Sequence, residues 1–262
     1  MKLFLKIAYL GTAYCGYQVQ PNGITVQAKL NDAARELFGT ECDIVGCSRT
    51  DSGVHARGFC ATVAKKGTTG LETAIPTEKL PLALNAHLPD DISVLEAHFV
   101  SEDFHPRYGV VAKEYEYLIY NGAVRDPFLR DRAWQIPRKI DDTALERMRA
   151  AAACFVGKRD FSALRDQGAD TDPGDATREV FLAVVERKGD LISFRVRADG
   201  FLYHMVRIMA GTLRDVARGT IPVEELPVRI ASLNRHLLGA TAPACGLYLD
   251  RVFYPEKTIS DL

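Results

Sequence analysis

The arrangement of this chain is set by residues 25–65, TVQAKLNDAARELFGTECDIVGCSRTDSGVHARGFCATVAK. In residues 26–38 the apolar side chains recur at helical spacing, with Thr25 as a suitable N-cap and Gly39 just past the end. Residues 41–48 and 58–65 are strand-like, and the turn-rich TDSGVHARG joins them. We therefore predict a helix followed by two strands, which the turn-rich segment connects.

The segments on either side of this stretch complete a pattern. Residues 2–9 alternate apolar and polar side chains as a strand does, and residues 92–99 are also strand-like. A second helix is expected near 77–87, with Pro81 shortening or displacing its start. The resulting order is βαββαβ, which is the ferredoxin-like split unit.

The second half of the chain repeats this order of elements without an obvious repeat of sequence. Residues 180–188 and 191–198 form a predicted hairpin around Gly189-Asp190, a strong turn signal. The other elements expected are strands at 113–121 and 246–254 and helices at 143–156, 203–218 and 224–237. We predict an α+β fold with mainly antiparallel sheets, made of two ferredoxin-like halves, 1–103 and 104–262.

Composition is that of an ordinary globular protein, with 47% hydrophobic and 26% charged residues among 262. The N-terminus lacks the continuous apolar region of a signal peptide, and no stretch approaches the ~20 apolar residues of a membrane span. We therefore expect a cytoplasmic protein. The six cysteines have no Cys-x-x-Cys spacing, which predicts reduced structural thiols, three of them in apolar strand-like surroundings, and no metal site. These three are Cys42, Cys47 and Cys60.

Net charge is −1, which argues mildly against a nucleic-acid partner. The charge is unevenly distributed, however. Residues 107–139 hold seven basic and four acidic side chains, and residues 195–218 hold five basic and two acidic ones. Part of the compensating acid lies in residues 166–177, so a surface with one basic side is compatible with the sequence.

Asp51 is the candidate catalytic residue. It lies in the predicted turn after a strand, within Ser48-Arg49-Thr50-Asp51-Ser52-Gly53-Val54-His55-Ala56. Aspartate is ionised at neutral pH, since its pKa is ordinarily about 3.9, so it can act as a nucleophile without a neighbouring base. If the strand persists to Asp51, Arg49 projects from the same face. Asp-Ser-Gly is also an everyday turn, and chemistry alone does not identify a reaction.

The nine residues 48–56 closely resemble the catalytic motif of the tRNA pseudouridine synthase A family. Further segments resemble that family in the same order along nearly the whole chain. They are Tyr9-Leu10-Gly11-Thr12, Gly16-Tyr17-Gln18, Asn85-Ala86-His87-Leu88-Pro89 with Asp91-Ile92, Phe104-His105-Pro106-Arg107-Tyr108, Lys113-Glu114-Tyr115-Glu116-Tyr117, Phe201-Leu202-Tyr203-His204-Met205-Val206-Arg207 and Gly246-Leu247-Tyr248-Leu249.

This resemblance implies an isomerase that converts uridine to pseudouridine at positions 38–40 of the tRNA anticodon arm, without cofactor or metal. It also implies a homodimer with an active-site cleft between the two halves. The family's nucleophile corresponds to Asp51 in the first half, and its active-site tyrosine to Tyr115 in the second. Substrate-binding arginines correspond to Arg49 and Arg107, with Arg107 expected near Asp51. RNA contacts are expected at three further residues, Tyr17, Gln18 and Arg207, whereas no catalytic role is implied for His55, which is expected in a turn or the core.

The sequence departs from the family pattern at Ser48, where glycine is usual, at Tyr17, where tryptophan is usual, and at Leu10, where aspartate is usual. Two other classes also stay open on the residues themselves. One is a non-catalytic RNA-binding protein, which would not need Asp51. The other is a different aspartate-nucleophile enzyme, a glycosidase or phosphotransferase, although the second carboxylate or phosphate loop that these need is not visible.

Overall fold

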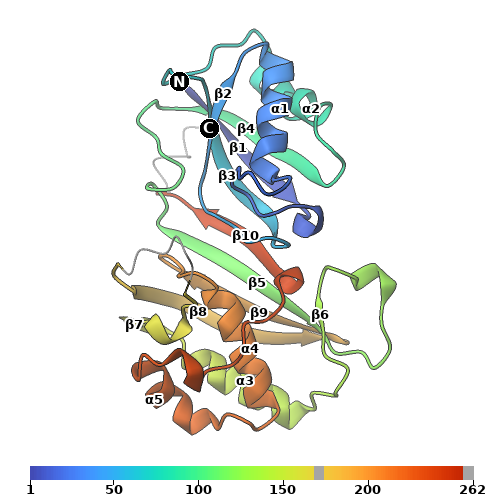
Figure 1. The fold of residues 1–262 in the computed structure, drawn as a ribbon, viewed down its shortest axis with the longest axis vertical. Coiled ribbons are helices and arrows are strands. Elements are labelled where there is room, and N and C mark those ends of the chain that lie inside the picture. The colour runs from blue at the N-terminus through green and yellow to red at the C-terminus, as the bar shows by residue number, and fades with distance from the viewer. Residues whose placement is uncertain (168–173, 256–262) are drawn as a thin grey trace. The chain divides into compact units, whose positions relative to one another are not determined.

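Contacts divide the computed structural model, which describes residues 1–167 and 174–255, into two units. Unit 1 comprises Met1–Val111 and the segment that starts at Tyr248, and unit 2 comprises Ala112–Leu247. Both are built of strands and helices, with sheets that are mainly antiparallel, so the predicted α+β class is confirmed (Figure 1). No helix in these described residues is long and apolar enough to span a membrane.

The sheet of unit 1 is built around β3 (His55–Lys65), which is eleven residues long. β1 (Lys2–Tyr9) pairs with one edge of β3, and β4 (Ile92–Val100) pairs with β1. The other edge of β3 is shared: β2 (Cys42–Gly46) pairs antiparallel with its far half. β10 (Leu247–Phe253) pairs in parallel with its first residues, through Tyr248 opposite His55 and Leu249 opposite Ala56.

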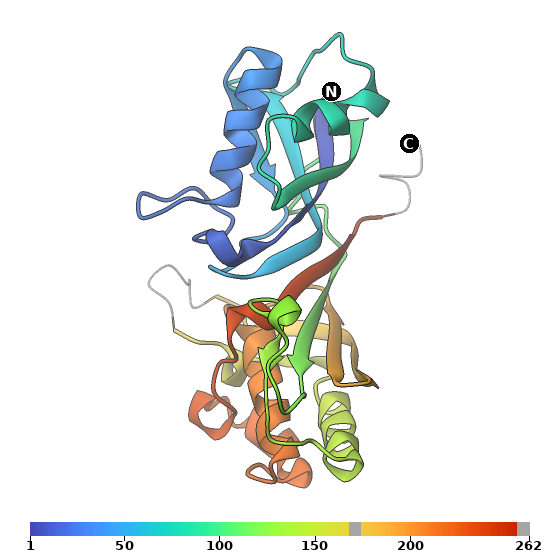
Figure 2. The ribbon, with the colours of Figure 1, turned by 90° about the vertical axis from the view of Figure 1, so that its right-hand side faces the viewer.

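Two helices lie side by side on one face of this sheet, α1 (Val26–Phe38) and α2 (Leu80–Asn85) (Figures 1 and 2). The ends of α1 are those predicted, because the Thr25 hydroxyl accepts a hydrogen bond from the amide of Ala28 and Gly39 adopts the left-handed conformation. α2 follows a short 3₁₀ turn and begins with Pro81 in its first turn, as expected.

The predicted division at residues 103 and 104 differs from these contact-defined units. Phe104 packs edge-on against Phe4 of β1 and also contacts Tyr254, so the segment after residue 103 shares the core of unit 1. Residues 248–255 belong with unit 1 because β10 extends the edge of β3.

Unit 2 has a sheet in the order β5 (Ala112–Tyr120), β9 (Leu191–Ala198), β8 (Thr177–Lys188) and β7 (Gly157–Asp160), with every neighbouring pair antiparallel. The two-residue β6 (Trp134–Gln135) pairs in parallel with β5. Helices α3 (Asp142–Ala153) and α4 (Met205–Ala217) pack side by side (Figure 1).

One predicted helix of unit 2 is much shorter than expected. Instead of 224–237, α5 covers only Leu226–Ala231, between 3₁₀ turns at Val223–Glu225 and Arg235–Leu237. The positive φ of Leu233, 58°, stops the helix from continuing. Of the acidic stretch 166–177, residues 168–173 lie outside the described residues.

Candidate active site

Asp51 lies in the loop that connects β2 to β3. β2 ends at Gly46, so the strand does not persist to Asp51 and the condition for Arg49 and Asp51 to share a strand face is not met. The loop instead turns sharply after Asp51: the amide of Val54 donates to the Asp51 carbonyl oxygen at 3.1 Å, and Gly53 between them has φ of 78°. Asp51 itself is half-buried at this turn.

The first part of this loop is attached to the end of β1 and to the segment that follows it. The hydroxyls of Tyr9 and Thr50 are hydrogen-bonded at 2.8 Å, and the amide of Tyr17 donates to the Thr50 carbonyl oxygen at 3.2 Å. Gly16, with φ of 81°, lies so close that a Cβ on it would stand 2.6 Å from that same carbonyl oxygen. The residue immediately before Asp51 is therefore fixed on both its side chain and its backbone.

The last part of the loop is attached through His55. This histidine is fully buried, and its Nδ1 accepts a hydrogen bond from the amide of Gly11 at 2.9 Å. An accepting Nδ1 carries no proton, so the ring is neutral with its proton on Nε2. Its ring packs against that of Tyr248, with 4.7 Å between centroids. The expectation that His55 lies in a turn or the core is confirmed.

Tyr17 lies in the core beneath the loop rather than at the surface. Its ring is 3% exposed and stacks on Phe59, with centroids 4.2 Å apart. Burial raises the pKa of its hydroxyl well above the ordinary value for tyrosine. A ring enclosed in this way cannot stack on a nucleotide without leaving the core, so the predicted RNA contact at Tyr17 is inconsistent with its position.

The other predicted contacts of unit 1 are at the surface. Arg49, Gln18 and Arg107 are exposed, and the backbone amide of Arg107 donates to Nδ1 of His105 at 3.1 Å. Exposure is what a residue that binds RNA requires. Their contacts with a substrate, and the pairing of Arg107 with Asp51, stay predictions.

Tyr115, the predicted active-site tyrosine, is in β5 of unit 2, opposite Val196 of β9. It is 7% exposed, and its ring meets that of Phe201 edge-on, with 5.0 Å between centroids and 86° between planes. Tyr117 is fully buried and donates its hydroxyl to the Pro243 carbonyl oxygen at 2.7 Å, so it is a core residue. Phe201 was not among the predicted site residues. It nevertheless lies in residues 201–207, one of the segments that resemble the tRNA pseudouridine synthase A family.

The start of α4 is held by a polar cluster around Asp166. One carboxylate oxygen lies 2.8 Å from Nδ1 of His204 and accepts from the Thr241 hydroxyl, and the other accepts from Nε of Arg235 at 2.6 Å. Burial alone would raise the pKa of Asp166, but these hydrogen bonds outweigh it and lower the pKa to about 2. His204 has a positive φ of 61°, a conformation that this cluster helps to hold.

Arg207 follows in the first turn of α4 and is half-buried. Its Nε donates to the Ala242 carbonyl oxygen at 2.8 Å, so its side chain is already attached to the protein. Neighbouring Met205, Ile208 and Met209 are buried, as expected of core residues. Contact between Arg207 and RNA stays a prediction.

Among the residues that the structure describes, no group of three His, Cys, Asp or Glu side chains could hold a metal ion. All six cysteines are free thiols. The expectation that three of them are buried is confirmed for Cys42, Cys47 and Cys60.

Unit 1 thus presents a carboxylate on a tight turn whose two flanks are hydrogen-bonded to the end of β1 and to the segment after it. Such a group can act as a nucleophile, because hydrogen bonds around it fix the backbone from which it projects. The sequence did not predict that Tyr9 and Gly11 support this turn. The spacing of glycines at 11 and 16 was a usable signal, since glycine allows the close backbone approach observed here.

Comparison with known proteins identifies the family. The family described as tRNA pseudouridine synthase matches residues 6–109 and 151–255. The tRNA pseudouridine synthase A of Acetivibrio thermocellus is 42% identical over 250 residues, 95% of this chain and 98% of that protein. The proteins of the same name from Caldicellulosiruptor saccharolyticus and Moorella thermoacetica are 40% and 43% identical, each over 96% of this chain and 99% of their own length. The chain therefore belongs to the tRNA pseudouridine synthase A family.

Proposed function

We propose that this protein converts uridine to pseudouridine at positions 38–40 of the tRNA anticodon arm, with Asp51 as the nucleophile and without a cofactor. The observation that carries this proposal is the setting of Asp51 on a turn fixed by hydrogen bonds on both flanks, within the segment that resembles the family's catalytic motif. Family membership supports the substrate class.

The reaction breaks the N1–C1′ bond of uridine, turns the uracil in place and joins C5 to C1′. The proton on C5 is lost and N1 gains one, so the product is an isomer of the substrate. A carboxylate can attack C1′, add to C6 of the base or assist removal of a proton from the sugar. These three routes share one requirement, which is a charged carboxylate held against the nucleotide while the free base is kept from escaping.

The target nucleotide must first leave its stack, at a cost of a few kcal/mol. We assign Tyr115 to stacking against the extruded uracil, because a phenol with an ordinary pKa near ~10 is a poor base at neutral pH. Arg49 and Arg107 are assigned to the substrate, where a guanidinium can grip a phosphate or orient Asp51. Gln18 and Arg207 are assigned to the RNA, whereas Tyr17 is not, because its ring already stacks on Phe59.

The proposal includes an architecture and an assembly. Unit 1 has the antiparallel strand order β4-β1-β3-β2 with two helices on one face, which supports a ferredoxin-like half. We propose a second such half in the rest of the chain, an active-site cleft between them, a homodimer and a cytoplasmic location. The basic segments 107–139 and 195–218 supply the charge that an RNA surface needs.

The test is incubation of unmodified tRNA with wild type, with Asp51→Asn and with the control Asp90→Asn. The control makes the same substitution at an exposed aspartate of the same unit. Pseudouridine is then detected at each position, and three tRNA variants with cytidine at 38, 39 or 40 assign the sites. We expect product from wild type and Asp90→Asn, also in the presence of a chelator, and none from Asp51→Asn.

Equal product from Asp51→Asn and wild type would remove the aspartate mechanism. Modification outside positions 38–40 would leave the isomerase intact and remove the assigned positions. Binding of tRNA without product from any variant would favour the non-catalytic RNA-binding alternative.

A further inference from the structure

The carbonyl oxygen of Tyr14 holds the two residues that follow Asp51. The Ser52 hydroxyl donates to it at 3.1 Å and the amide of Gly53 donates to it at 3.4 Å. Gly53 is the positive-φ residue of the Asp51 turn, so this single oxygen accepts from both central positions of the turn. The position of Asp51 therefore depends on where Tyr14 places its backbone.

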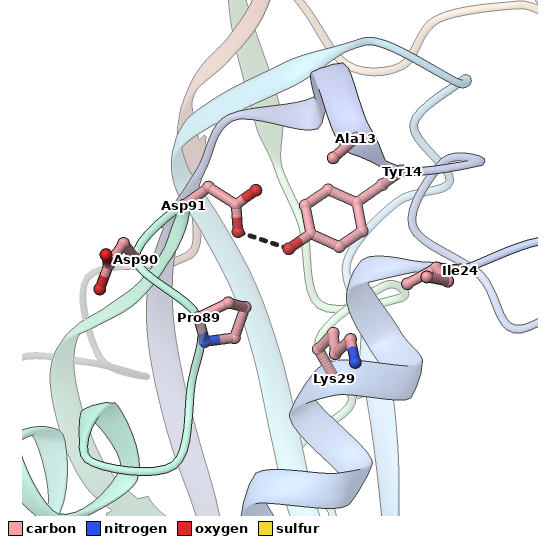
Figure 3. A pocket seen from close by; sticks show the side chains of 7 residues that line it. All are labelled: Ala13, Tyr14, Ile24, Lys29, Pro89, Asp90 and Asp91. Atoms are coloured by element: carbon pink, nitrogen blue, oxygen red, sulfur yellow. Dashed lines mark hydrogen bonds between the residues drawn. The ribbon is translucent and has the colours of Figure 1, made fainter.

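The side chain of Tyr14 is fixed at its far end by Asp91. Its hydroxyl donates a hydrogen bond to Oδ1 of Asp91, which lies just before β4 (Figure 3). Burial and this bond to a carboxylate raise the pKa of the Tyr14 hydroxyl, which keeps it protonated as the donor. The backbone of Asp91 contributes as well, because its carbonyl oxygen accepts from the amide of Leu10 at 2.9 Å. Asp91 thus holds the segment at both Leu10 and Tyr14.

The ring of Tyr14 is held by packing as well as by this bond, since it is only 5% exposed. Tyr14 borders a hollow of about 340 Å³, which Asp91 also lines. Figure 3 shows the other residues around it, which are Ala13, Ile24, Lys29, Pro89 and Asp90. The bond from the hydroxyl to Asp91 fixes the far end of the ring within this packing.

We propose that Tyr14 and Asp91 are positioning residues for the isomerisation: the hydroxyl–carboxylate bond fixes the segment 10–14, and the Tyr14 carbonyl oxygen then fixes the Asp51 turn. This inference rests on the proposed function, since it gives Asp51 the catalytic role. Neither residue touches the substrate in this scheme. Their effect is on how accurately the carboxylate is placed, and a displacement of about 1 Å can cost on the order of 100-fold in rate.

The test measures kcat, KM and tRNA affinity of variants that alter only this bond. Tyr14→Phe removes the hydroxyl and Asp91→Ala removes the acceptor, and each is expected to lower kcat by about 10- to 100-fold with KM and Kd within about two-fold of wild type. Asp91→Asn is expected to keep most of the activity, because an amide oxygen also accepts. The matched control is Asp90→Ala, which removes the neighbouring carboxylate of the same hollow and is expected to behave as wild type.

The double variant Tyr14→Phe/Asp91→Ala is expected to be no slower than the slower single variant, because both changes break the same link. Wild-type kcat in Tyr14→Phe, additive losses in the double variant, or equal losses in Asp91→Asn and Asp91→Ala would each overturn the inference. Asp51→Asn is measured beside them. If Asp51→Asn is inactive and Tyr14→Phe keeps the wild-type rate, the positioning role fails but the proposed function stands. If Asp51→Asn is active, the proposed function itself is removed.

Discussion

A single methyl group at Gly11 tests whether the placement of the Asp51 loop controls catalysis. In Gly11→Ala the new Cβ would stand 2.0 Å from the carbonyl oxygen of Val54 and 2.6 Å from its carbonyl carbon. Real Cβ atoms essentially never approach another heavy atom closer than 3.0 Å, so the two backbones must separate by at least about 1 Å. No flexible side chain can absorb this movement, because the atoms in contact belong to the backbone.

The displaced residue is directly coupled to the nucleophile. The amide of Val54 closes the turn on the Asp51 carbonyl oxygen, and the amide of Gly11 donates to Nδ1 of His55. A shift of about 1 Å at Val54 is therefore expected to lower kcat on the order of 100-fold. Overpacking of this kind also costs about 1–3 kcal/mol of folding free energy.

The assay is single-turnover pseudouridine formation on unmodified tRNA, with thermal unfolding measured on the same preparations. Gly39→Ala is the matched control, because Gly39 at the end of α1 has φ of 65° and nothing within 4 Å of an added Cβ. It is expected to lose about 1 kcal/mol from backbone strain and to keep its rate. Folded Gly11→Ala that reacts as fast as wild type would refute the reasoning, as would an equal loss of rate in Gly39→Ala.

Three further outcomes are expected. Thr25→Ala removes the N-cap of α1 and should lower the free energy of unfolding by about 1 kcal/mol without changing kcat, which urea unfolding and steady-state kinetics check. His55→Phe keeps an aromatic ring but leaves the buried amide of Gly11 without its acceptor; a loss of about 1–3 kcal/mol is expected, and an unchanged unfolding midpoint would contradict it. Asp166 has a folded pKa of about 2 against an ordinary 3.8, so the stability it provides is present above about pH 4 and lost as pH falls towards 2. Because its side chain is 25% exposed, we expect only about 1 kcal/mol, seen in urea unfolding as a difference between wild type and Asp166→Asn that shrinks over this pH range.

Sequence patterns predicted the elements whose signals are local. Both ends of α1 were predicted to the residue, since an N-cap and a left-handed glycine are properties of a few consecutive residues. The hairpin of β8 and β9 followed from Gly189-Asp190 for the same reason. The short polar β7 and the two-residue β6 escaped prediction, because so few residues give no periodicity.

The sequence predicted some features of the candidate site and missed others, and the difference has physical reasons. Asp51 and His55 were correctly separated into a loop carboxylate and a core histidine. The support of the loop by Tyr14 was missed, because it runs through a backbone oxygen, which leaves no trace in residue type. Tyr17 was assigned to RNA from its residue type, which suits a surface position and a core position equally well. Only the stacking of its ring on Phe59 in the structure shows that it lies in the core.

The pairing of β10 with β3 also concerns the order in which the molecule is made. His55 and Ala56 leave the ribosome about 190 residues before Tyr248 and Leu249, their partners. At roughly 5–20 residues per second, this edge waits on the order of 10–40 s for its neighbour. A nascent or truncated chain that stops near residue 111 contains Asp51 and its loop but lacks β10, which pairs with the first residues of β3. A version of unit 1 that keeps this pairing therefore needs residues 248–255 joined to it.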